Sequence, residues 1–349
     1  MSILILPPFP HRGRWSTDFH QEIAFPRTSG TSGTWELTAH MYSMECDVPV
    51  QQVHLKPGMT VKSLISAMEQ AGAYNGGALS RAVSITGTMY QDKRVTRFFG
   101  LAGAMVPAGM GGIVSDLMEA GYIDVLVSTG ANLTHDIIEA IGCHHFRGTE
   151  KCNDVELRHD EINRIYDVYL PNESFIKFEE FMQDVLSKIP DGTVLSITDL
   201  LAHIGSHLNS GILATASRKK IPVFCPAVQD SMIGLQFWLY RQTHKIVVDA
   251  FGDMDKIMDR CFSADIAGAF FVGGGVPKNY ILQSMLMTPK GFTYAVQLTG
   301  DRPDLGGLSG ATLDEARSWG KVDEDAQTVT VYGDATITFP LIMSAVLEM

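Results

Sequence analysis

The sequence predicts an α/β protein in which a parallel β-sheet is covered by helices on both faces, a doubly wound arrangement. The first indication is a set of short, almost entirely apolar runs, such as IDVLVS and IAGAFFV. The second is that small-residue turns and helical segments follow several of these runs. Apolar strands that alternate with helices are typical of parallel sheets buried between helical layers.

The first 45 residues differ from the rest of the chain. PPFPHRGR and RTSGTSGT are rich in proline, glycine, serine and threonine and show no sustained periodicity. The length of 349 residues allows one large domain or two moderate ones. We expect an irregular N-terminal arm over residues 1–45 and a single α/β domain over residues 46–349.

The domain is predicted to begin with helices. TVKSLISAMEQAG (60–72) starts at a capping threonine, carries an amphipathic pattern and ends at glycine. ALSRAVSITGTMYQ (78–91) is a second helical candidate. Neither segment has the apolar character of a buried strand.

Units of strand, turn and helix follow. The clearest is IDVLVSTGANLTHDIIEAIG (123–142), and TVLSITDLLAHIG (193–205) repeats its pattern. Segment 266–287 gives a strand, three glycines and a helix with Pro277 near its start. Further strands are expected in four segments, which are IPVFCPAVQD (221–230), HKIVVDA (244–250), TYAVQLTG (293–300) and TVTVYGDA (328–335).

Composition excludes some classes of function. A net charge of −12 argues against nucleic acid as a main partner, because phosphate binding needs clustered lysine and arginine. The longest apolar run, ADIAGAFFVGGGV (264–276), is too short and too rich in glycine to cross a membrane. SILILPPFP near the N-terminus lacks the features of a signal peptide. Five scattered cysteines indicate reduced thiols, so a cytoplasmic location is expected.

Sites in parallel sheets lie beyond the carboxyl ends of the strands, which directs attention to the small-residue turns. Ser128-Thr129-Gly130, Gly273-Gly274-Gly275 and Gly333-Asp334-Ala335 could each let a phosphate approach backbone N–H groups at a helix start. No G-x-G-x-x-G fingerprint or P-loop is present, and GLAGAMVPAGMGG (100–112) has the wrong spacing. Asp230 ends another apolar segment and is equally suited to bind a ligand or to cap a helix.

CHHFRGTEKC (143–152) invites a zinc interpretation, because cysteine and histidine are zinc ligands. Adjacent His144 and His145 would point apart on regular structure, and no C-x-x-C or H-x-x-x-H pair is present. We therefore expect a polar loop and no metal.

ATLDEARSWGKVDED (311–325) carries the residues of greatest chemical interest. Thr312 can cap a short helix, Gly320 can end it, and Lys321 can interact with its C-terminal dipole. A second interpretation is that Lys321 is an amine nucleophile, with Trp319 as a cation–π surface and Glu315 on the same helix face. Burial would favour the neutral amine that such chemistry needs.

Several segments together resemble the deoxyhypusine synthase family. The resemblance rests on SGATLDEA followed by SWGKV, on FFVGGGVPKNYI and STGANLTHD upstream, and on VYGDATITFPLI (331–342). It covers about residues 55–349 in the family's order and implies an NAD-binding α/β fold of deoxyhypusine synthase type. It also implies a homotetramer with sites at subunit interfaces.

The resemblance assigns roles by position. Lys321 matches the family's catalytic nucleophile, and Glu315, Trp319 and Asn279 match its substrate pocket. The residues expected to hold NAD are Thr129, Gly130, Asp230, Gly274, Gly275, Ser309, Asp334 and Ala335. No metal is implied.

The chain departs from the family pattern around the polyamine. Positions that the family fills with acidic or other polar residues carry Leu235, Leu308, Asn279, His135 and the pair Gly103-Ala104. Each lost charge-assisted hydrogen bond removes roughly 1.5–3 kcal/mol. Asp301 and Asp304 could compensate from the loop that carries Leu308.

Three functions follow as hypotheses. The first is an NAD-dependent transferase that moves an aminobutyl group from a polyamine such as spermidine, through a Lys321 imine, to a small polyamine or diamine, as in homospermidine synthesis. The second is deoxyhypusine synthase, which acts on a lysine of a translation factor. The third is a non-catalytic NAD-binding protein.

Overall fold

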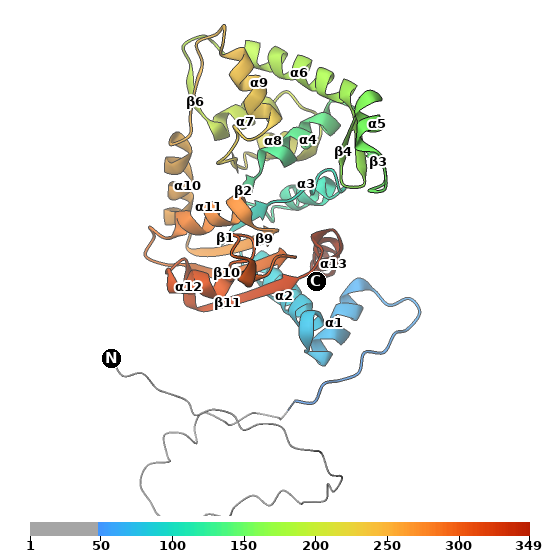
Figure 1. Cartoon of the computed structure of the whole chain (residues 1–349). Helices are drawn as coiled ribbons and strands as arrows, with labels where there is room; N and C mark the ends of the chain where they lie inside the picture. The colour runs from blue at the N-terminus through green and yellow to red at the C-terminus, as the bar shows by residue number, and fades with distance from the viewer. Residues whose placement is uncertain (1–47) are drawn as a thin grey trace, which may run out of the picture. The chain divides into compact units, whose positions relative to one another are not determined.

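A six-stranded, fully parallel sheet lies at the centre of the computed structural model, which describes residues 48–349 (Figure 1). The N-terminal arm predicted over residues 1–45 lies outside the described residues. The strands of this sheet are β1 (Val95–Leu101), β2 (Val125–Ser128), β7 (Val223–Phe224), β9 (Ile266–Val272), β10 (Phe292–Thr299) and β11 (Val322–Tyr332).

The strand order is β11-β10-β9-β1-β2-β7. The first strand along the chain, β1, is central, and β2 and β7 are added in turn on one side of it. The remaining strands, β9, β10 and β11, are then added in turn on the other side of β1. This is the strand order of dinucleotide-binding folds, in which the crevice lies where the direction of winding reverses. Here that point lies between β1 and β9, which pair in register from Val95↔Ile266 to Leu101↔Val272.

Side chains alternate between two apolar cores, one on each face of the sheet. Phe99 and Phe270 belong to the core beneath α2 and α13, whereas Phe98 and Phe271 belong to the core beneath α10, α11 and α12. All four rings are almost completely buried. The prediction of an α/β fold with a covered parallel sheet is therefore confirmed.

The helices of the described residues follow their sequence signals. Thr60 caps α1 through its side chain and Gly72 ends it with φ 64°, as predicted. Thr312 caps α12 in the same way. The helices are α1 (Val61–Ala71), α2 (Tyr74–Gln91), α3 (Gly111–Glu119), α4 (Gly130–Ala140), α5 (Asp154–His159), α6 (Asn172–Ser187), α7 (Ile197–Gly205), α8 (Gly211–Lys219), α9 (Met232–Tyr240), α10 (Gly252–Ser263), α11 (Gly275–Met285), α12 (Leu313–Ser318) and α13 (Ala335–Leu347). Within residues 48–349, none combines the length and apolar character that crossing a bilayer requires.

The predicted strand pattern differs from the structure in three places, one of which is a small antiparallel sheet within residues 146–171 that was not predicted. The strand segments within 193–205 and 244–250 form β6 (Val194–Ser196) and β8 (Val247–Asp249), which pair with each other in a separate two-stranded sheet and do not join the main one. The central strand β1 was not predicted, although VTRFFGL is rich in β-branched and aromatic residues.

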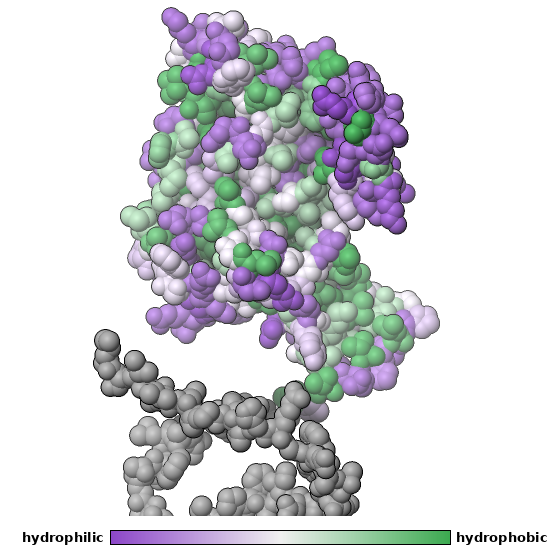
Figure 2. Space-filling model, viewed as in Figure 1, coloured by the Kyte–Doolittle hydropathy of each residue, from purple (hydrophilic) through white to green (hydrophobic). Residues whose placement is uncertain are grey.

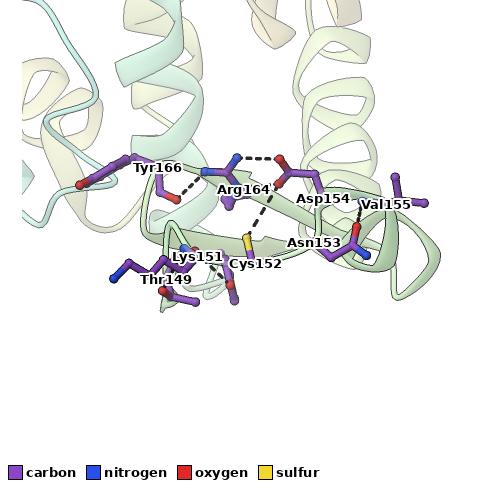
Figure 3. Close-up of polar contacts among 9 residues, drawn as sticks. Thr149, Lys151, Cys152, Asn153, Asp154, Val155, Arg164 and Tyr166 are labelled. Carbon is purple, nitrogen blue, oxygen red and sulfur yellow. Dashed lines mark hydrogen bonds and ion pairs between the residues drawn. The ribbon is translucent and has the colours of Figure 1, made fainter.

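A small antiparallel sheet stands beside the main one. It consists of β3 (Phe146–Arg147), β5 (Val168–Pro171) and β4 (Ile162–Ile165). Figure 2 shows mostly hydrophilic residues over this corner, where α5 packs against β4. Arg164 donates to both carboxylate oxygens of Asp154, at 2.6 and 2.8 Å, and so ties β4 to the start of α5 (Figure 3).

Phe99 connects the sheet to α13, because its ring lies 5.6 Å from the Phe270 ring and 5.9 Å from the Phe339 ring. Replacement by alanine leaves a cavity between them. We expect Phe99→Ala to lower the free energy of unfolding by about 3–5 kcal/mol, measured by urea denaturation at fixed protein concentration. The exposed Phe262 is the matched control, and Phe262→Ala should change stability by less than about 0.5 kcal/mol. Equal effects of the two substitutions would contradict the assigned core.

Candidate functional site

The three predicted turns all lie at the carboxyl edge of the main sheet. Thr129 follows β2 and caps α4, and its hydroxyl accepts a hydrogen bond from Asn132 N. Gly273 and Gly274 separate β9 from α11. Asp334 follows β11 and caps α13. Because parallel strands end at one edge, residues far apart in the sequence meet there.

A cavity of ≈ 370 Å³ opens at this edge. Three predicted NAD ligands line it, namely Thr129, Gly130 and Asp230. Gly130 has no substitute, because a Cβ there would lie 2.5 Å from Ser231 Oγ. The remaining lining residues come from the ends of β1 and β7 and from neighbouring segments, and they are Gly103, Ala104, Ser128, Ala131, Asn132, His135, Ile165, Cys225, Ala227 and Val276.

Asp230 does not cap a helix. Ser231 performs that role for α9, with its hydroxyl accepting from Gly234 N. The Asp230 carboxylate forms no hydrogen bond within residues 48–349 and lines the cavity instead. Of the two interpretations of Asp230, the capping one is wrong, and the nucleotide-binding one stays a prediction.

The side-chain amide of Asn132 holds the cavity wall together. Its Oδ1 accepts from Val106 N at 3.1 Å, and its Nδ2 donates to Gly103 O at 2.7 Å. These bonds join α4 to the loop after β1. Asn132 was not predicted, because nothing in GANLTHDIIEA separates it from the other polar residues of this helix, of which Thr134 and Asp136 are also buried.

A second buried amide, Gln297 on β10, joins the next two loops. Its Nε2 donates to Gly273 O at 3.1 Å and to Ser309 O at 2.8 Å. Ser309 therefore lies against Gly274, where a Cβ would come within 2.5 Å of Ser309 Cα. The structure therefore brings together the predicted NAD ligands Gly274, Gly275 and Ser309. Gln297, which holds their two loops together, was not predicted.

Asp334 and Ala335 stand at the end of the same edge, after β11. The Asp334 carboxylate accepts from Thr336 N and from the Thr336 hydroxyl, both at 2.8 Å. The adjoining strand end is covered by Arg302, whose guanidinium lies 4.2 Å from the centre of the Tyr332 ring. These residues occupy the predicted position, and their role in binding NAD stays a prediction.

Lys321 lies at the opposite edge of the sheet. It immediately precedes β11, and its carbonyl accepts from Phe292 N at the first residue of β10. Its Nζ lies 5.4 Å from the centre of the Trp319 ring, and that tryptophan is 62% exposed. Trp319 ends α12 as its C-cap, so the predicted helix end is confirmed. The predicted burial of Lys321 is not seen in a single chain, because this side chain is only half-buried.

The buried lysine is Lys278, on the first turn of α11. It is 3% exposed, and its Nζ donates to Ala311 O at 2.6 Å and to Gln297 Oε1 at 3.2 Å. Burial lowers the pKa of Lys278 to about 8, while the nearby Glu315 carboxylate opposes that shift. Glu315 thus lies close enough to influence Lys278, and the predicted Asn279 follows it on α11.

The two predicted halves of the site are far apart within one chain. The eight-residue β10 separates the level of Lys321 from the carboxyl edge. At about 3.3 Å per residue this distance is roughly 23 Å. A lysine side chain is much shorter than that. Lys321 therefore cannot reach a ligand in the cavity of its own chain.

His144 and His145 converge on Glu139 instead of pointing apart, because the segment after α4 is irregular. His144 Nδ1 lies 3.0 Å from Glu139 Oε2, and His145 Nδ1 lies 2.6 Å from Glu139 Oε1. The expected polar loop is therefore present, although the predicted orientation was wrong. No cluster of three or more possible metal ligands occurs among residues 48–349.

Two larger cavities lie away from the strand ends. One, of ≈ 590 Å³, is lined by Asp154, Arg164 and other polar residues of the α5–β4 corner, which already pair with one another (Figure 3). The other, of ≈ 730 Å³, lies beside α10. Neither is reached by a predicted site residue, so the cavity at the carboxyl edge is the better candidate.

Comparison with known proteins gives consistent matches. The family model described as deoxyhypusine synthase matches residues 63–346. "Probable deoxyhypusine synthase 1" of Methanosarcina acetivorans is 57% identical over 301 residues, which are 85% of this chain and 94% of that protein. The protein of the same name from Archaeoglobus fulgidus is 41% identical, over 86% of this chain and 98% of its own length.

Among solved structures, a protein from Entamoeba histolytica named as a deoxyhypusine synthase aligns with a TM-score of 0.60. The alignment covers 86% of this chain and 97% of that one, at 18% identity. At this identity the similarity concerns the fold alone.

The buried Lys278 makes stability depend on pH. An unfolded lysine titrates near 10.4, so between pH 8 and 10 the unfolded chain binds more protons than the folded chain. Raising the pH through this range should stabilise the wild type relative to Lys278→Met by on the order of 2 kcal/mol, whereas below pH 8 the difference should be constant. Urea denaturation at pH 7, 8, 9 and 10 measures the effect, with exposed Lys290→Met as the control. A difference that falls with rising pH would contradict the burial of a cation at this position.

Proposed function

The chain belongs to the deoxyhypusine synthase family, a family of NAD-dependent aminoalkyl transferases, and from this premise we propose that it moves the aminobutyl group of spermidine to a protein lysine through an imine on Lys321. The observation that carries the proposal is the extent of the similarity, 57% identity over 94% of a relative with that name. The segment SGATLDEARSWGK also contains the lysine, tryptophan and glutamate that match the family's nucleophile and substrate pocket.

The choice of acceptor follows the relatives. A small polyamine was the first acceptor expected from the sequence, because six positions of the family pattern are altered. The names of the relatives favour the second hypothesis, a protein lysine. Two of the altered positions, Leu235 and Leu308, are about half exposed, so the surface that meets the polyamine is less acidic than the family pattern.

The residues at the carboxyl edge fit a dinucleotide. The N-termini of α4 and α11 both face this edge, and helix N-termini attract phosphate. Small residues at Gly103, Ala104 and Gly130 leave the backbone accessible. Asp230 offers a carboxylate without another partner in the described chain, which suits a ribose hydroxyl.

The chemistry of Lys321 is transimination. Bound NAD supplies the acceptor for the hydride removed from the donor amine and, once reduced, the hydride that completes the product. The neutral Lys321 amine adds to the oxidised donor carbon, the bond from that carbon to the departing amine breaks, and the proton lost by Nζ goes to that amine. The acceptor lysine then adds to the same carbon, the bond from that carbon to Lys321 Nζ breaks, and the proton lost by the acceptor returns to Lys321. Trp319 offers its ring to the cationic chain of the substrate.

The distance across the sheet supports a site assembled from two copies. The cavity of one chain and Lys321 of another can meet only across an interface, because they lie roughly 23 Å apart within one chain. The exposure of Trp319 agrees with a surface that a partner covers. A closed dimer related by a two-fold axis would contain two such sites, and the proposed homotetramer two such dimers.

Lys321→Ala should abolish the covalent adduct formed with spermidine and NAD, because no other group would hold the aminobutyl chain. The adduct is trapped with a hydride reductant and located by intact-mass measurement and peptide mapping. We expect a loss of at least about 10³-fold in transfer. Exposed Lys290→Ala is the control and should retain the adduct. Full transfer by Lys321→Ala would refute the role of Lys321.

Mixing two inactive variants tests the two-copy site. Ala104→Trp should fill the cavity from an exposed position and so prevent the thermal stabilisation that NAD gives the wild type. Lys321→Ala lacks only the nucleophile. Random assortment of the two should recover about a quarter of the wild-type activity, because half of the dimers then contain one intact site of two. No recovery after subunit exchange would place the whole site in one chain.

A further inference from the structure

A chain of hydrogen-bonded side chains leads from the cavity to the surface. His135 lies on α4 and lines the cavity. Its Nδ1 lies 2.9 Å from His145 Nε2, and His145 Nδ1 lies 2.6 Å from Glu139 Oε1. The His145 side chain is 7% exposed and Glu139 is 38% exposed, so the series runs from the cavity through a buried ring to a solvated carboxylate.

The hydrogen bonds that link His135, His145 and Glu139 are compatible with two protonation states of the two histidines. When His145 is neutral, its Nδ1–H donates to Glu139 and its Nε2 accepts from His135 Nδ1–H. His135 Nε2 is then unprotonated, and it has no hydrogen-bond partner within the described residues. When the pair holds one more proton, His145 carries it beside Glu139, donates through Nε2 to His135 Nδ1, and leaves a proton on His135 Nε2.

The environment determines where the extra proton rests. Burial, together with the charge of His145, lowers the pKa of His135 to about 4, and the charge of Glu139 only partly opposes this effect. The extra proton is therefore disfavoured on His135, whereas the Glu139 carboxylate lies 2.6 Å from His145 Nδ1 at the other end of the series. His135 receives a proton on the cavity side and passes another outward, as an imidazole does between a reacting group and a carboxylate.

Other titratable groups of the cavity suit this task less well. Burial raises the pKa of the Cys225 thiol to about 12, so it stays protonated near neutral pH. The Asp230 carboxylate would stabilise a cationic amine rather than remove its proton. Asp136, the neighbour of His135 on α4, is already bound, since its carboxylate accepts from Ile212 N and Leu213 N; burial raises its pKa to about 6, and the charge of Glu139 adds to that effect.

We propose that His135 is the proton-exchanging residue of the cavity and that His145 and Glu139 position it and carry the proton away. The proposal rests on the proposed function, in which a protonated amine must become neutral before its carbon can be oxidised. The amine N–H proton moves to His135 Nε2, the Nδ1 proton moves to His145 Nε2, and the reverse transfer returns a proton to the departing amine. No atom other than the proton changes place.

The first test needs neither cofactor nor amine. Hydrogen–deuterium exchange at histidine C2, followed by peptide mass spectrometry over a pH series, gives the pKa of each histidine. We expect the pKa of His135 to lie well below the ordinary histidine value of about 6.5, and to rise by about one unit in His145→Gln because a neighbouring cation is removed. An unchanged pKa of His135 in His145→Gln would overturn the relay.

The second test measures the rate of adduct formation on Lys321 at saturating spermidine and NAD from pH 7 to pH 10. His135→Gln should reduce the rate at pH 7 by roughly 10²–10⁴-fold. The rate should recover about tenfold per pH unit as the amine loses its proton to solvent. His144→Gln is the matched control, since His144 binds the same carboxylate but is 67% exposed and lies outside the cavity lining.

The outcomes separate the two proposals. A His135→Gln protein that behaves as His144→Gln does, or that loses the same factor at every pH, overturns the role of His135 in proton exchange. A wild-type protein that forms no adduct refutes the proposed transfer, and histidine exchange then decides whether the relay exists on its own. Addition of imidazole to His135→Ala should partly restore the rate if the variant lacks only a proton acceptor. No recovery would indicate that the substitution has changed the structure of the cavity.

Discussion

The common direction of the six central strands is the constraint on which the rest of this molecule depends. Because every strand of the main sheet runs the same way, all residues that follow strands gather at one edge, and all residues that precede them gather at the other. Thr129, Gly274 and Asp334 meet at the first edge, and Lys321 stands at the second. Under the proposed function, a nucleotide at the first edge and Lys321 at the second can cooperate only between chains, which would make association of subunits part of the chemistry.

Two buried amides give the carboxyl edge its shape. Asn132 binds the loop after β1, and Gln297 binds the loops after β9 and β10. Each amide forms hydrogen bonds with backbone groups that would otherwise be buried without partners. Leaving such a group without a partner costs about 1–3 kcal/mol. Lys278 joins the contacts of Gln297, because its buried amine donates to Gln297 Oε1 and to Ala311 O. These contacts make the loops rigid, and a rigid edge can position a ligand without reorganising.

The departures from the family pattern acquire a physical meaning in the structure. Leu235 and Leu308 place apolar, half-exposed side chains where the family pattern has acidic residues, which lowers the negative charge of the surface proposed to meet a polyamine. His135 replaces an acidic position with a ring that bonds to His145. A carboxylate would attract a cationic amine, whereas a neutral imidazole can exchange a proton with it. In the proposed mechanism, His135 thus weakens the attraction of the pocket for a cationic amine and adds a group that can exchange a proton with it.

The sequence by itself determined the fold class, the main turns and the family. Apolar runs such as IAGAFFV, the capping residues Thr60 and Thr312, and the segment SWGKV are local signals, and local signals can be read from one chain. It did not reveal β1, whose position at the centre of the sheet depends on partners more than twenty residues away. Nor did it reveal Asn132, Gln297 or the bonding of His135 to His145. These contacts exist only because the chain brings distant segments together, so tertiary structure alone decided which polar groups face the cavity and how far Lys321 lies from it.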